Sequence, residues 1–122
     1  MLRRLLLPLA LVGISLAATA AGNAGTTRSA GLTGEVGPGY TIEVKLAGKD
    51  LKTIKAGTYK IKIEDKASSH DFHLVGPGVN KYTSVAFVGE KIWTVTLKPG
   101  KYTYKCDPHA LAGMLGSFRV TR

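Results

Sequence analysis

The 122-residue chain is poor in the residue types that build disulfides and multi-centre metal sites. It contains one cysteine, which excludes an intrachain disulfide, and three histidines, which are too few for several separate metal centres. Acidic residues are scarce as well: the chain has eight of them and 17 lysines and arginines, which gives a formal net charge of +9. With 44% hydrophobic and 20% charged residues, the composition is typical of one folded domain rather than of a disordered chain.

The first 20 residues have the features of a secretory signal peptide. Arg3 and Arg4 precede an apolar run over residues 5–17, which ends in the small residues Ala18-Thr19-Ala20. The run has 13 residues, whereas a transmembrane helix needs about 20. We therefore expect residues 1–20 to be removed and the protein to be exported to the periplasm or the cell exterior; an uncleaved membrane anchor is the alternative. Removal leaves 15 basic and eight acidic residues, a net charge of +7.

Export bears on the single cysteine, Cys106. In an oxidising compartment an unpaired thiol tends to be oxidised or to form mixed disulfides. A bound metal ion is the simplest protection for such a thiol, and burial as an inert side chain is the alternative.

The rest of the chain predicts an all-β domain. Residues 21–34 are small and poor in core-forming side chains, and they predict a flexible N-terminal arm. Over residues 35–122, short β-branched and aromatic runs alternate with turns that contain glycine and proline. This pattern predicts a Greek-key β-sandwich or barrel of about seven to eight strands. The candidate strands are residues 40–46, 58–64, 72–75, 83–88, 91–97, 101–106 and 116–120.

Alternation within two of these strands assigns side chains to faces. Trp93 shares a face with Val95 and Leu97, so we expect it to be a core residue. In the strand over residues 101–106, both tyrosines share a face with Cys106, so the cysteine points inward at the strand's end.

The segment that begins at this strand end carries the chemistry. Cys106, His109 and Met114 follow the spacing Cys-x2-His-x4-Met. Soft sulfur ligands together with imidazole favour copper, and a blue-copper site uses two histidines, one cysteine and a distant methionine. Zinc prefers four tightly bound tetrahedral ligands, among which methionine is a poor choice. The second histidine must then be His70 or His73, the other two in the chain.

These segments together resemble the cupredoxins, in particular their plastocyanin and amicyanin branch. The run from Tyr102 to His109, followed by Gly113 to Gly116, matches the C-terminal copper loop of plastocyanins in ligand order and spacing. Upstream, Lys98 to Tyr102 is similar to the family's turn into that strand, where the tyrosine hydroxyl anchors a Greek-key corner. The resemblance covers residues 35–122.

The resemblance implies one copper ion and identifies His70 as the remaining ligand, because the family's first histidine directly precedes an asparagine and an apolar strand. Asp71 stands in the place of that asparagine, and a carboxylate accepts hydrogen bonds but cannot donate them as an amide does. We expect His73 to lie on the opposite face of the strand, at the rim of the site. The implied ligand set is His70, Cys106, His109 and Met114.

The implied function is the transfer of single electrons between redox partners, without an enzymatic activity. A copper carrier or storage protein with the same ligands is the alternative, and a metal-free binding module of the same fold is a weaker one. Multicopper oxidases and copper nitrite reductases need further histidine clusters, and a binuclear copper electron-entry site needs two cysteines.

The positive charge of the chain indicates which kinds of partner it could bind. Seven lysines crowd the first half of the domain, and such a surface would attract acidic redox proteins or anionic membranes. Mere solubility is the alternative reading of these lysines. Nucleic acid is a poor candidate because no binding motif is present. We expect a monomer. The lysines are Lys45, Lys49, Lys52, Lys55, Lys60, Lys62 and Lys66.

Overall fold

A computed structural model describes residues 27–122, with the side chains of residues 28–30 left out. The predicted signal peptide, residues 1–20, and residues 21–26 of the predicted arm lie outside the described residues. No helix in the described part is long and apolar enough to cross a bilayer.

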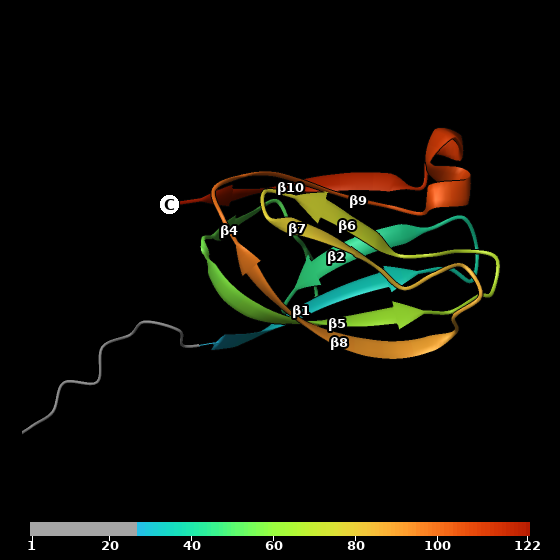
Figure 1. The fold of residues 1–122 in the computed structure, drawn as a ribbon, viewed down its shortest axis with the longest axis horizontal. Coiled ribbons are helices and arrows are strands. Elements are labelled where there is room, and N and C mark those ends of the chain that lie inside the picture. The colour runs from blue at the N-terminus through green and yellow to red at the C-terminus, as the bar shows by residue number, and fades with distance from the viewer. Residues whose placement is uncertain (1–26) are drawn as a thin grey trace, which may run out of the picture.

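The described residues form two five-stranded sheets that face each other (Figure 1). Sheet A contains, in spatial order, β3 (Lys49–Asp50), β2 (Ile42–Leu46), β1 (Thr27–Val36), β5 (Gly57–Asp65) and β8 (Gly89–Leu97). Sheet B contains β4 (Thr53–Lys55), β10 (Leu115–Thr121), β9 (Gly100–Lys105), β6 (His73–Gly76) and β7 (Val79–Tyr82). The pairs β1–β5 and β4–β10 are parallel and the other pairs are antiparallel, so both sheets are mixed. The predicted all-β sandwich is confirmed, and the sheets do not close into a barrel.

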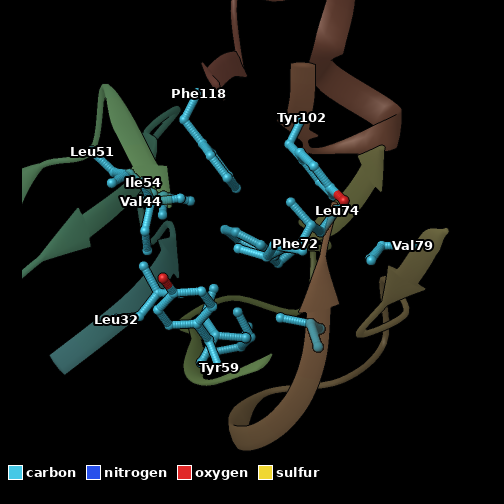
Figure 2. Close-up of a cluster of buried hydrophobic side chains, with 14 of the residues drawn as sticks. Leu32, Val44, Leu51, Ile54, Tyr59, Phe72, Leu74, Val79, Tyr102 and Phe118 are labelled. Carbon is cyan, nitrogen blue, oxygen red and sulfur yellow. The ribbon is translucent and has the colours of Figure 1, made fainter. Parts of the chain in front are cut away.

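The core lies between the inner faces of the two sheets (Figure 2). Alternate residues of each strand point inward, which is why residues as far apart in sequence as Leu32 and Phe118 belong to one cluster. Tyr102 stacks on Phe118 with ring centroids 5.4 Å apart. Trp93 packs against this core and is only partly buried, in agreement with the face assigned to it.

Tyr102 also fixes a corner of the sandwich. Its hydroxyl donates a 2.6 Å hydrogen bond to the Pro77 carbonyl and accepts one from the Lys98 backbone N–H at 3.0 Å. A Cβ at Gly76 would collide with the Tyr102 ring, so the close approach of this strand requires glycine. The corner role implied by the cupredoxin resemblance is therefore confirmed.

The predicted arm over residues 21–34 is wrong from Thr27 onward, because Thr27–Val36 forms β1 in the centre of sheet A. Leu32 is buried in the core. Gly34 faces the core, where an added Cβ would lie 2.6 Å from the Phe72 ring. Glycine here permits tight packing rather than flexibility, and composition alone could not distinguish the two.

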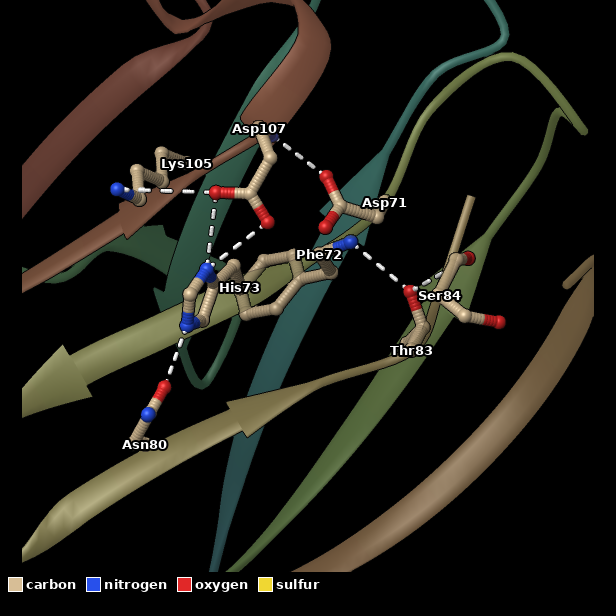
Figure 3. Close-up of polar contacts among 8 residues, drawn as sticks. All are labelled: Asp71, Phe72, His73, Asn80, Thr83, Ser84, Lys105 and Asp107. Atoms are coloured by element: carbon tan, nitrogen blue, oxygen red, sulfur yellow. Dashed lines mark hydrogen bonds and ion pairs between the residues drawn. The ribbon is translucent and has the colours of Figure 1, made fainter. Parts of the chain in front are cut away.

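The predicted strand over residues 83–88 is also wrong. The strand in this region is β7, which ends at Tyr82. The Thr83 hydroxyl then accepts a 2.9 Å hydrogen bond from the Phe72 N–H (Figure 3). It also donates a hydrogen bond to the Asp65 carboxylate at 3.0 Å. These bonds hold Thr83 inside the fold, and Ser84 follows in the left-handed region with φ +78°, so the extended backbone stops.

Candidate metal centre

The segment between β9 and β10 folds into a tight cap at one end of the sandwich (Figure 1). Cys106 directly follows β9, a short 3-10 helix (η1, Asp107–Ala112) comes next, and Gly113 closes it with φ +99°. The Cys106 N–H donates to the Met114 carbonyl at 3.1 Å, and the Met114 N–H donates to the His109 carbonyl at 3.2 Å. The backbone of the loop thereby closes on itself and fixes the positions of its three candidate ligands.

Three donor atoms converge beneath this cap. The Cys106 Sγ lies 3.6 Å from the His70 Nδ1 and 3.4 Å from the His109 Nδ1, and the two Nδ1 atoms are 3.0 Å apart. Three ligand atoms about 2.0–2.3 Å from one ion in a trigonal plane are separated by roughly 3.5–4 Å. Small rotations of these side chains therefore suffice for all three to bind one metal ion.

The fourth predicted ligand, Met114, is fully buried at the end of the same loop. Its backbone is hydrogen-bonded to Cys106 and His109, so it lies next to the cluster of His70, Cys106 and His109, in which His70 and Cys106 are buried and His109 is half-buried. The donor set is thus two imidazoles, one thiol and one thioether, which suits copper better than zinc or a hard cation.

Burial raises the pKa of the Cys106 thiol, and this effect outweighs nearby backbone hydrogen bonds that lower it. A thiol with a raised pKa is protonated at neutral pH until a metal ion displaces the proton. In the metal-free protein the free thiol is therefore poorly reactive as a nucleophile.

Asp71 connects the His70 segment to the loop. Its carboxylate accepts a 2.6 Å hydrogen bond from the Asp107 N–H (Figure 3). Burial and, to a lesser extent, the neighbouring Asp107 carboxylate raise the pKa of Asp71 to about 6. This contact needs only an acceptor, so aspartate can serve here in place of the asparagine usual in the family.

His73 lies outside the three converging donor atoms. Its Nδ1 is 2.9 Å from the Asp107 carboxylate, and its Nε2 is 2.5 Å from Asn80 Oδ1 (Figure 3). With Asp71 and Asp107 it forms a second group of possible ligand atoms, but the Lys105 ammonium lies 3.6 Å from Asp107 and opposes a cation there. His73 instead bridges the β6–β7 hairpin and the loop.

Two residues at the site had no signal in the sequence. Tyr40 contacts both histidine rings edge to face, with centroids 4.8 Å from His109 and 5.6 Å from His70. Gly37 leaves room for His70, because an added Cβ would lie 3.0 Å from its ring. Both belong to the β1–β2 loop, which Figure 1 shows at the same end of the sandwich as η1. The sequence predicts turns that contain glycine and proline, but no pattern in it predicts that this one, Gly37-Pro38-Gly39, lies beside the metal centre.

A two-sheet β-sandwich whose end gathers two histidines, a cysteine and a methionine defines the cupredoxin class of blue-copper proteins. The family model of copper binding proteins of the plastocyanin/azurin family matches residues 35–121. The chain therefore belongs to that family, and its cofactor is one copper ion.

Solved structures of rusticyanin share the fold. Reduced rusticyanin is 22% identical with a TM-score of 0.55, over 80% of this chain and 81% of that chain. A structure of rusticyanin from Thiobacillus ferrooxidans is 24% identical with a TM-score of 0.53, over 80% of this chain and 79% of that chain. A rusticyanin variant gives 24% identity and a TM-score of 0.57 over 80% and 79% of the two chains.

Proposed function

We propose that this protein is an exported electron carrier in which His70, Cys106 and His109 would hold one copper ion and Met114 would be a fourth, weaker ligand. The observation that supports this most directly is the convergence of the Cys106 Sγ and two Nδ1 atoms to within 3.6 Å of one another. Copper bound by such a ligand set could change between Cu(I) and Cu(II) and so accept and release one electron.

The chain's own contribution is a rigid and largely dry ligand cage. His70 and Cys106 are buried and come from segments 36 residues apart that are hydrogen-bonded through Asp71 and Asp107. A cage that cannot relax keeps similar ligand positions in both oxidation states, which lowers the barrier to electron transfer. His109 is half-buried beside the fully exposed Leu111, so we assign the entry and exit of electrons to this end of the sandwich.

The visible spectrum of the copper-loaded protein tests this function. We expect one Cu(II) per chain, an intense blue colour from the thiolate–copper bond, and reversible bleaching by a mild reductant. Cys106→Ser removes the thiolate and should abolish the colour in a folded β-protein. His73→Ala is the matched histidine control and should stay blue. A colourless stoichiometric Cu(II) complex, or tight binding of Cu(I) alone, would instead indicate a copper carrier.

Export rests on the pattern of residues 1–20 and has a separate test. We expect the protein recovered from the periplasm or the medium to begin near residue 21, as read by mass spectrometry. Retention of the full-length chain in the membrane fraction would favour the uncleaved anchor.

A further inference from the structure

The outer face of sheet A carries balanced charge. All four glutamates of the sequence lie in its strands, at positions that alternate with buried core residues. Lys45, Lys62 and Lys66 form ion pairs with them at 2.6–3.0 Å. Three of the seven lysines in the first half of the domain are therefore neutralised locally. The glutamates are Glu35, Glu43, Glu64 and Glu90.

The outer face of sheet B carries unpaired positive charge. Its five strands, all within the described residues, contain no aspartate or glutamate. Lys101 lies directly opposite Arg119 in the β9–β10 register, and Lys55 extends the same face on β4. Lys105 is 3.6 Å from Asp107, whereas Lys55, Lys101 and Arg119 have no ion pair within 4.0 Å among the described residues.

A shallow hollow of about 220 Å³ lies on this face. Lys101 supplies a cation to its wall, and Thr103 and Ser117, which are paired across β9 and β10, supply hydroxyl groups. An ammonium group beside two hydroxyls can hydrogen-bond a carboxylate and neutralise its charge. The hollow is therefore suited to an aspartate or glutamate side chain.

The basic face is continuous with the metal centre. β9 runs directly into Cys106, and β10 begins at Leu115, the residue after Met114. Leu115 lines the hollow and is 54% exposed. A protein bound on this face would rest on the two strands that position the cysteine and methionine ligands, beside the end at which we place electron entry.

We propose that the outer face of sheet B, centred on Lys101, Thr103, Ser117 and Arg119, is the docking surface for an acidic redox protein. This proposal rests on the proposed electron-transfer function. An anionic membrane is the weaker candidate, because lipid recognition typically uses clusters of four to eight basic residues and three unpaired cations fall short of that. A protein partner can place carboxylates individually, and charge complementarity of this kind sets the encounter rate and orientation.

Nuclear magnetic resonance of the isotope-labelled Cu(I) protein, titrated with poly-L-glutamate at low salt, tests the proposal. We expect the shifted backbone signals to cluster at residues 101–103 and 117–119 and the binding to weaken as salt is added. The readout is binding alone. A failure of docking is thus distinct from a failure of the electron-transfer function, which the visible spectrum reports.

Two double variants with the same change of net charge provide the decisive comparison. Lys101→Glu/Arg119→Glu should weaken binding of poly-L-glutamate at least about tenfold, because both cations at the centre of the surface are reversed. Lys49→Glu/Lys60→Glu places equal charge on sheet A and should change it by less than about twofold. Equal losses in both variants, or shifted signals on sheet A, would overturn the proposal.

Vesicles of phosphatidylserine and phosphatidylcholine test whether the negatively charged partner is a membrane rather than a protein. We expect no measurable binding of the Cu(I) protein to vesicles at physiological salt. Vesicle binding that depends on Lys101 and Arg119, without binding of poly-L-glutamate under the same conditions, would replace the protein partner by a membrane and overturn the proposal.

Discussion

His73 links two segments that meet beside the metal centre. One ring nitrogen contacts Asp107 in the ligand loop, and the other contacts Asn80 in the β6–β7 hairpin. Burial by itself would lower the pKa of His73, but the contacts with Asn80 and Asp107 outweigh it and raise the pKa. The protonated imidazole donates to both partners, so this link is strongest when His73 is charged.

The raised pKa predicts a pH dependence of stability. Because folding favours protonated His73, its contribution is fully present below the unfolded pKa of about 6.5 and is lost as pH rises through the folded pKa. We expect His73→Gln to lower the free energy of unfolding by about 1–2 kcal/mol at pH 5.5 and by less at pH 8.5. Denaturant unfolding of both metal-free proteins measures this, and a difference that does not vary with pH would contradict it.

Asp71 permits a prediction about the copper potential. Asp71→Asn keeps an oxygen that can accept the Asp107 N–H bond and removes a buried negative charge next to His70. A nearby negative charge stabilises Cu(II) over Cu(I), so we expect the variant to stay blue and its reduction potential to rise. Voltammetry at pH 8, where Asp71 is ionised, gives the comparison, and a lower potential would disprove the electrostatic account.

Among the strands, β1 shows how packing can require glycine inside a regular element. Gly34 pairs with Val44 of β2 and Ile63 of β5, and its missing side chain makes room for the Phe72 ring. Phe72 in turn lies two residues beyond His70. The central strand of sheet A is therefore in contact with the segment that delivers the first histidine ligand.

Gly34→Ala should accordingly destabilise the fold. The new Cβ would lie 2.6–2.8 Å from the ends of the Phe72 and Ile63 side chains, and such overpacking costs about 1–3 kcal/mol. Gly39→Ala is the control, because its Cβ would meet nothing within 4 Å, and we expect a change within about 0.5 kcal/mol. Thermal unfolding measures both, and equal effects would show that the fold accommodates a Cβ at Gly34 without overpacking.

For the molecule as a whole, the sequence predicted those features that depend on residues close together in the chain. Cys106, His109 and Met114 could be recognised because they lie within one loop, and the inward face of Cys106 followed from strand alternation. His70 is 36 residues from Cys106 and was assigned only through a family resemblance. The placement of Tyr40 beside both histidines depends on the β1–β2 loop reaching the same end of the sandwich, which no local pattern reveals.

The predictions that failed share one cause, which is that tertiary contacts override local composition. Residues 27–34 looked like a linker but supply part of a central strand, and Thr83 left the strand pattern because its hydroxyl joins Asp65 to Phe72. The prediction of an acidic partner or an anionic membrane from the lysines of the first half is not among these failures and stays a prediction. The face on which positive charge is left unpaired depends on where the glutamates lie, and that is fixed by the folding of the two sheets.

The 36-residue separation of His70 and Cys106 has a thermodynamic consequence. An ion held by both residues is a cross-link, and closing a loop of about 36 residues in the unfolded chain costs about 4 kcal/mol of conformational entropy, as it would for a disulfide of that span. The chain lacks any intrachain disulfide, so copper would take over that role. We expect removal of copper to lower the melting temperature by well over 10 °C, measured by calorimetry. Unchanged melting would mean that the metal also remains bound, with equal affinity, to the unfolded chain.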